Sequence, residues 1–170
     1  VTVAGQPPSN PQIGQVFVSS LTVTWGDVAD NDGYVIEAYD DGGYLNLVTS
    51  SITANTDASG LSFNFNTLQP NTTYWIKAGS LFNGTTAYAN TVPDSTSTLT
   101  DLITGAQFYR TYVTSITVNW VELSTAVGYR LQASGVSDFS AIAGSNETLT
   151  GVTPSTLTVI SLDSNREYWF

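Results

Sequence analysis

The stretch Leu21-Thr22-Val23-Thr24-Trp25 alternates apolar and polar side chains and is built from residue types that favour β-strands. Such alternation places Leu21, Val23 and Trp25 on one face of a strand, where they can enter a core. The same pattern returns 95 residues later as Ile116-Thr117-Val118-Asn119-Trp120. The two stretches therefore predict two copies of one β-strand motif.

Three further blocks recur in the same order along the chain. They are Gly33–Ala38 with Gly128–Ala133, 95 residues apart, and, 94 residues apart, Phe63–Leu68 with Leu157–Leu162 and Asn71–Trp75 with Asn165–Trp169. A repeat of this length is too long for a solenoid unit and has the size of a sandwich domain.

Short strands joined by Gly, Asn, Asp, Ser and Pro turns indicate a two-sheet sandwich in each repeat. Alternation predicts the core of the first repeat as Leu21, Val23, Trp25, Tyr34, Ile36, Phe63, Phe65, Leu68, Tyr74 and Ile76. It predicts the core of the second as Ile116, Val118, Trp120, Tyr129, Leu131, Leu157, Val159, Leu162 and Tyr168.

The order of a Trp, a Tyr and then Leu68-Gln69-Pro70-Asn71-Thr72-Thr73-Tyr74 resembles the fibronectin type III pattern. The last motif resembles a tyrosine corner, in which the phenol bonds to backbone a few residues upstream. The second copy, Leu162–Tyr168, keeps Leu, Asn and Tyr but lacks the proline. The resemblance implies two tandem seven-stranded antiparallel β-sandwiches, an all-β fold. Immunoglobulin-like sandwiches of other topology remain open.

The predicted domains are residues 1–7 as the end of a preceding repeat and a linker, 8–97 as repeat 1 and 98–170 as repeat 2. The second repeat is expected to be incomplete, because the first continues for about 30 residues past the point matching Phe170. Its last strands would come from further chain or from a neighbouring chain, which could donate Val1–Val3 as a strand.

The charge of the chain excludes several kinds of partner. Four Lys and Arg stand against 14 Asp and Glu, for a formal net charge of -10. Phosphate neutralisation needs basic clusters, so we expect neither nucleic acid binding nor attraction to anionic lipid. No segment approaches the apolar length of a membrane helix, so membrane insertion is not expected.

The residue inventory argues against catalysis. The chain has no His, Cys or Met, which removes the common triads, thiol nucleophiles and zinc sites. Two carboxylates could still serve a glycosidase, but Glu37, Glu122, Glu147 and Glu167 do not share a predicted cleft. We expect no enzymatic activity and no cofactor.

Two kinds of candidate site remain. Asp27, Asp30 and Asp32 share one loop and could hold calcium, although Asp-Asn-Asp-Gly is also ordinary turn chemistry.

The second kind is aromatic. Trp75 and Trp169 follow the corner tyrosines, so alternation points them outward, where each could stack on a sugar or a neighbouring subunit or cover a strand of its own sheet. Tyr109 and Tyr112 lie on or near a first strand and could pack between repeats.

These features favour a non-enzymatic structural repeat of a large secreted or surface protein of bacterial type, forming a fibre, filament or adhesin stalk. Its expected partners are other copies or repeats of the same protein, with glycans as a second class. The alternative is a spacer or carbohydrate-contacting module of a secreted polysaccharide-degrading enzyme. A third interpretation is a phage or cell-surface receptor-binding protein.

Overall fold

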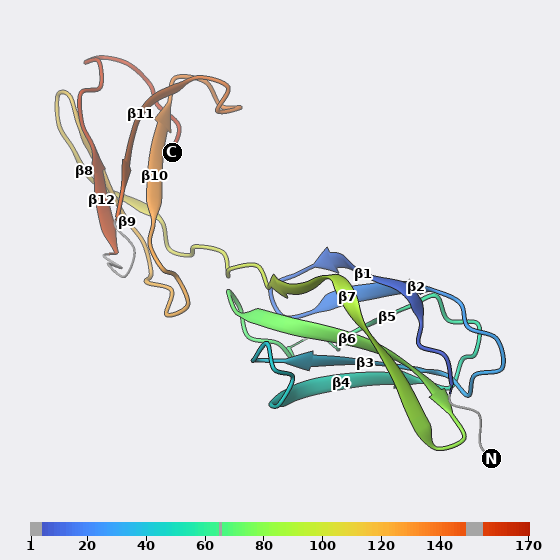
Figure 1. Cartoon of the computed structure of the whole chain (residues 1–170). Helices are drawn as coiled ribbons and strands as arrows, with labels where there is room; N and C mark the ends of the chain where they lie inside the picture. Colours follow the sequence, from blue (N-terminus) through green and yellow to red (C-terminus); the bar gives the residue numbers. More distant parts are fainter. Residues whose placement is uncertain (1–4, 65, 149–154) are drawn as a thin grey trace. The chain divides into compact units, whose positions relative to one another are not determined.

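The computed structural model describes residues 5–64, 66–148 and 155–170. The chain divides into two compact units, Val1–Thr100 and Asp101–Phe170. Every regular element in the described residues is a β-strand and none is a helix (Figure 1). The all-β prediction is confirmed.

In its described residues, the first unit has seven strands in two antiparallel sheets. One sheet has the order β1-β2-β5, with β1 at Ser9–Val16, β2 at Leu21–Gly26 and β5 at Gly60–Ser62. The other has the order β4-β3-β6-β7, with β3 at Tyr34–Tyr39, β4 at Leu47–Thr53, β6 at Thr73–Phe82 and β7 at Thr85–Ser97.

The core of the first unit lies between these sheets, as the alternation predicts. The rings of Trp25 and Tyr34 pack with centroids 5.1 Å apart. Nine of the ten predicted core residues are buried, and the tenth, Phe65, lies outside the described residues. The buried set also includes Ala38 and Ala78.

The second unit repeats most of this plan. One sheet has the order β12-β9-β8, with β8 at Gln107–Thr111, β9 at Ile116–Asn119 and β12 at Thr156–Val159. The other sheet pairs β10, Arg130–Ser134, with β11, Ile142–Glu147. In the described residues of this unit, β6 and β7 have a single counterpart, the bridge between Ser134 and Trp169.

The core of the second unit is looser at two predicted positions. Ile116 and Tyr168 are half-buried and pack against the core instead of lying inside it. Ile116 is the first residue of β9, and Tyr168 lies outside the named strands. The other seven predicted residues are buried, and Trp120 packs on Tyr129 with ring centroids 5.0 Å apart.

The strongest sign of duplication is the register of the paired strands. Val35 pairs with Ile52 in the first unit, and Arg130 pairs with Glu147 in the second, each residue shifted by 95. All five pairs of β10 and β11 follow this rule, and the register shift at the strand end recurs at the same place. The bridge corresponds as well, because Ser134–Trp169 matches the pair Tyr39–Trp75 with shifts of 95 and 94 residues.

Candidate interaction surfaces

Both units contain the tyrosine corner that the sequence predicts. The Tyr74 hydroxyl accepts a hydrogen bond from the Gln69 backbone N–H at 2.9 Å. The Tyr168 hydroxyl accepts one from the Asp163 N–H, also at 2.9 Å. The bond spans five residues in each unit, so the proline missing from the second copy is not needed to make it.

A second tyrosine anchor is also shared, and the sequence analysis did not find it. The Tyr34 hydroxyl accepts a hydrogen bond from the Val28 N–H at 3.0 Å, and the Tyr129 hydroxyl accepts one from the Leu123 N–H at 2.7 Å. Each bond spans six residues and fastens the loop between the second and third strands. The recurrence of Gly33-Tyr34 as Gly128-Tyr129 could have indicated this anchor. The pattern of alternation accounted for the two tyrosines as core residues, so no hydrogen bond was predicted for them.

The outward face of the β4-β3-β6-β7 sheet carries a cluster of aromatic and charged side chains, the outer-face cluster of Glu37, Tyr39, Tyr44, Lys77 and Tyr88. Glu37 accepts hydrogen bonds from the Tyr39 hydroxyl at 2.5 Å and from the Tyr88 hydroxyl at 2.8 Å. Lys77 Nζ lies 4.0 Å from the centre of the Tyr44 ring, a cation–π contact. The rings of Tyr39 and Tyr44 meet edge to face, 5.4 Å apart.

Burial raises the pKa of Tyr39 well above its ordinary value, and the hydrogen bond to Glu37 raises it further. The pKa of Tyr88 is raised for the same two reasons, in the same order. Both hydroxyls therefore stay protonated and donate to the carboxylate at physiological pH. The cluster is therefore an internally hydrogen-bonded surface.

Comparison with known proteins supports the fold alone. Neither a protein-family model nor a curated protein matches the sequence. A two-domain fibronectin type III segment of chicken tenascin superposes with a TM-score of 0.56 at 15% identity, over 96% of this chain and 87% of that chain. The fold is that of two tandem fibronectin type III domains.

Two other solved structures give lower TM-scores. The FN5 domain of Drosophila Lar gives a TM-score of 0.45 at 19% identity, covering 58% of this chain and 100% of its own. The FN1–FN3 domains of chicken CNTN1 give 0.39 at 16% identity, covering 99% of this chain and 62% of that one.

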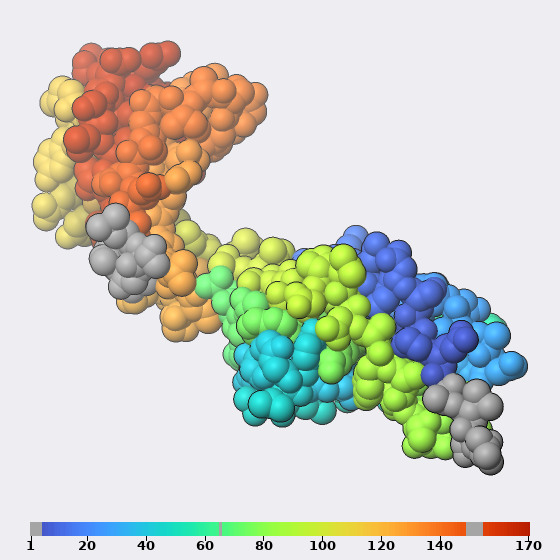
Figure 2. Space-filling model, in the orientation of Figure 1, coloured from blue at the N-terminus to red at the C-terminus, as the bar shows by residue number. Residues whose placement is uncertain are grey.

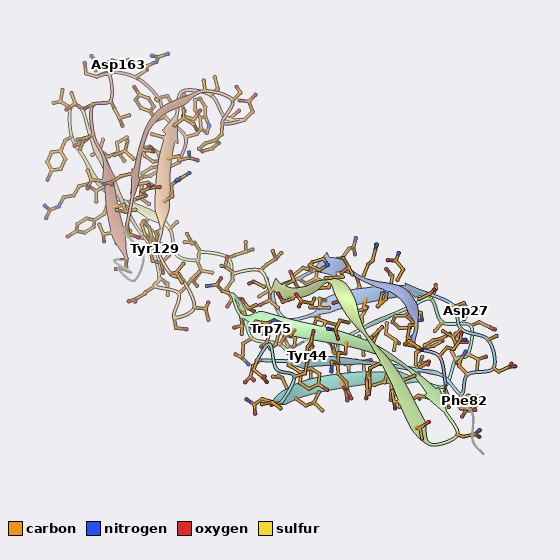
Figure 3. The ribbon with its side chains drawn as sticks, viewed as in Figure 1. Asp27, Tyr44, Trp75, Phe82, Tyr129 and Asp163 are labelled. Atoms are coloured by element: carbon orange, nitrogen blue, oxygen red, sulfur yellow. The ribbon has the colours of Figure 1, made fainter. Side chains whose placement is uncertain are left out.

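The two candidate tryptophans occupy matching places in the two domains, each of which has a fibronectin type III-like fold. Trp75 is half-buried, and a side chain at Gly42 would come within 3.1 Å of its indole nitrogen, so the ring covers the β3–β4 turn. Figure 3 shows Trp75 and Tyr44 close together near this turn, with Asp27 and Phe82 at the opposite end of the domain. Trp169 is 37% exposed. Contact of either ring with a sugar or a subunit stays a prediction.

Tyr109 and Tyr112 are more than half exposed within the second unit. The Arg110 guanidinium carbon lies 5.1 Å from the centre of the Tyr109 ring. Its Nη1 lies 3.5 Å from the Tyr112 hydroxyl oxygen. Tyr109 on β8 and Tyr112 just after it therefore both lie beside one arginine, and packing of these rings against another repeat stays a prediction.

The aspartates proposed for calcium do not converge. Asp27 accepts hydrogen bonds from the Tyr34 hydroxyl at 2.7 Å and the Val28 N–H at 3.0 Å, while Asp32 accepts one from the Asn83 N–H at 2.7 Å. The backbone of Asp30 takes a left-handed turn conformation with φ of 57°. Within residues 5–64, 66–148 and 155–170, no group of three or more acidic, His or Cys residues could hold a metal.

The second unit has an apolar cavity of about 500 Å³ between its sheets. It is lined by core residues, among them Val118, Trp120 and Leu131, and by Phe108 and Phe170. In the first unit the matching residues Val23, Trp25 and Ile36 are buried in a core that β6 residues help to form. No helix in the described part of the chain is long and apolar enough to cross a membrane.

Proposed function

We propose that this chain is a non-enzymatic structural segment of a secreted or cell-surface protein, which builds a fibre, filament or adhesin stalk. Tandem domains of this fold are typically extracellular modules without catalytic activity. The partners that we propose are other copies or repeats of the same protein. Glycans are a second partner class, for which the half-buried Trp75 and the exposed Trp169 offer ring faces.

The single observation that carries the proposal is the duplicated register. A sequence identity of 15% to a tenascin segment indicates no particular role. Two domains of one chain that share five of the six β3–β4 pairs by a shift of 95 are copies of one unit. Tandem copies of one domain suit a structural protein, because each copy adds the same length and offers the same contact surface.

The acidic groups support the same proposal because they already have structural partners. Glu37 is bonded by two tyrosine hydroxyls, and Glu147 forms an ion pair with Arg130 at 2.6 Å. A glycosidase needs two carboxyl groups facing each other across a bound sugar at about 5–9.5 Å. Each of these two glutamates is instead bonded to side chains of its own sheet.

The alternative function is a spacer within a secreted polysaccharide-degrading enzyme. The surface tryptophans favour it equally, because ring stacking on sugar would hold such an enzyme on its substrate. The two functions differ in where the full protein is found and in whether it hydrolyses glycan.

Immunogold electron microscopy of cells that produce the protein, with antibody against this chain, tests the proposal. Label along extracellular fibres or on the cell envelope is the expected result. The matched biochemical measurement is glycan hydrolysis by the full-length protein purified from the same cells. Label confined to the cell interior, or hydrolysis of a polysaccharide by the labelled protein, overturns the structural role.

A further inference from the structure

The edges of the first domain are protected in different ways, and β4 is the exception. The edge strand β1 contains Pro11 and two register shifts, β5 has three residues, and β7 contains Pro93 and Asp94. Proline, charge, bulges and short length are the devices by which proteins prevent edge strands from pairing with other chains. Among the described strands of the first unit, only β4 combines an edge position and seven residues with no proline, glycine or charge.

The side chains of β4 add an apolar surface to this open edge. Val48 is 42% exposed and Ile52 is 67% exposed, with the exposed Ser50 between them. Thr49 and Ser51 are half-buried, in line with their pairing to core residues of β3. The one register shift lies at the Leu47 end, so the rest of the strand keeps a regular ladder with β3. Figure 2 shows the cyan and teal atoms of β4 and its turn along the rim of the first unit.

The order of residues in β4 is complementary to itself. If two β4 strands run antiparallel with Ser50 opposite Ser50, then Val48 lies opposite the partner's Ile52 and Thr49 opposite the partner's Ser51. Pairs of aliphatic β-branched residues and pairs of hydroxyl residues are both favourable cross-strand pairs. A strand with this property fits a two-fold axis, because each residue then meets its correct partner twice.

The second domain shows how the same position is closed to pairing. Glu147 stands where Ile52 stands in the first domain, and Arg130 stands in the place of Val35. The two charged side chains form an ion pair across β10 and β11. A charge on an exposed edge opposes strand addition. The duplicated chain therefore carries one open edge and one protected edge at equivalent positions.

We propose that β4 is a homotypic contact, through which two copies of this chain pair antiparallel about Ser50 and join their β4-β3-β6-β7 sheets into one. The proposal rests on the structural role above, since it names the surface through which one copy of the chain meets another. The chain carries a net charge of -10, so two copies repel each other in dilute buffer. Salt that shortens the screening length to about 8 Å or less should therefore strengthen the pairing.

Site-specific cross-linking is the sharpest test, because the chain contains no cysteine. Directly opposed residues of antiparallel strands have Cα atoms about 4.5–5.5 Å apart, within disulfide range. The full chain with Ser50→Cys should therefore form a disulfide dimer under mild oxidation. Thr53→Cys is the matched control, because its own copies would lie about 20 Å apart in the same register. Equal cross-linking of the two variants overturns the pairing.

Sedimentation equilibrium over a range of protein and NaCl concentrations tests the contact without a covalent bond. The unmodified chain should dimerise, more tightly at higher salt, and Ile52→Glu should weaken the dimer roughly tenfold or more. Ile160→Glu is the control, since it makes the same change at a residue of the second unit that is 68% exposed. A chain that stays monomeric at every salt concentration, or an Ile52→Glu dimer of unchanged affinity, overturns the proposal.

The two proposals can fail separately. Immunogold label on fibres together with a monomeric chain removes only the β4 contact. A β4 dimer in a protein that hydrolyses glycan removes only the structural role.

Discussion

The two domains of this chain have similar cores and differ in their edge strands. The Trp–Tyr stack, both tyrosine anchors and the strand register recur, while the edge strand changes from apolar in β4 to charged in β11. A buried position is constrained by many neighbours at once, whereas an exposed edge position has few. The duplicated domains therefore kept the residues that the core requires, while their surface residues were free to differ between the two copies.

The largest expected difference between the domains concerns the core tryptophans. Trp25 is buried and its indole N–H donates to the Ala58 carbonyl at 2.8 Å. Trp25→Ala should cost about 3–5 kcal/mol of unfolding free energy in the first domain. Trp120→Ala should cost less, because Trp120 lines a cavity and its indole nitrogen has no partner among the described residues.

Urea unfolding followed by far-ultraviolet circular dichroism measures this difference. Each substitution should lower the unfolding midpoint of its own domain and leave the other domain unchanged. Equal losses for both tryptophans would show that the cavity does not weaken the packing of Trp120.

The loop anchors should differ by a smaller amount. Besides its bond to Val28, the Tyr34 hydroxyl donates to Asp27 at 2.7 Å and accepts from the Asn31 side chain at 3.1 Å. Removing a hydroxyl with several partners costs about 2 kcal/mol, and one with a single close partner costs about 1 kcal/mol. Tyr34→Phe should therefore destabilise its domain more than Tyr129→Phe, as read from thermal unfolding. The reverse order would contradict the assigned hydrogen bonds.

The tyrosine corners should differ less again. Tyr74 is 2% exposed and its bond from the Gln69 N–H is partly buried, so Tyr74→Phe leaves that N–H with little access to water and costs about 1–1.5 kcal/mol. Tyr168 is half-buried and Asp163 is exposed, so water can replace the lost bond in Tyr168→Phe. We expect a loss of about 0.5 kcal/mol there by chemical denaturation. A larger loss at Tyr168 would indicate that this corner is the more deeply buried one.

The smallest expected difference is a dependence on pH. The pKa of Asp41 is lowered, chiefly by the hydrogen bond from the Asn46 N–H, with further bonds from Leu45 and Gly43. The pKa of Asp138 in the second domain is lowered by its bond from Ser140. A lowered folded-state pKa gives stability that is present above the unfolded value of about 3.9 and is lost as pH falls below it.

Thermal unfolding of the chain between pH 5 and pH 2.5 measures this contribution. Asp41→Asn should remove more of the acid-dependent loss than Asp138→Asn, because the first carboxylate accepts bonds from three backbone N–H groups. Equal pH profiles for both variants would contradict this ranking.

The sequence predicted the buried core residues well and the exposure of residues at sheet edges poorly. Alternation located Leu21, Val23 and Trp25 in the core, and the spacing of 95 residues found the second copy. Alternation placed Ile36 in the core, where it is fully buried, but it gave no expectation for Ile52, which is 67% exposed. It also overestimated the burial of Tyr168. Burial of that kind depends on which strands lie alongside, and those come from distant parts of the chain.

The candidate sites were likewise predicted only as far as local alternation reaches. Alternation pointed Trp75 and Trp169 outward, but the contact of Trp75 with the turn at Gly42 depends on how two strands pair. The aspartate loop was visible as a cluster in the sequence, yet Asp27 and Asp32 bond to different segments. Glu37, Tyr39 and Tyr88 were not recognised as a group, because cross-strand neighbours are far apart along the chain.

By itself, the sequence determined that the chain is all-β, that one domain plan occurs twice, and which side chains build each core. These properties follow from the period of two along a strand and from the repeat of motifs, both of which are local in the chain. The tertiary structure alone decided that β4 is an unprotected edge and that its counterpart β11 carries an ion pair. Edge position depends on the lateral order of strands, and that order is set by long-range hydrogen bonding between them.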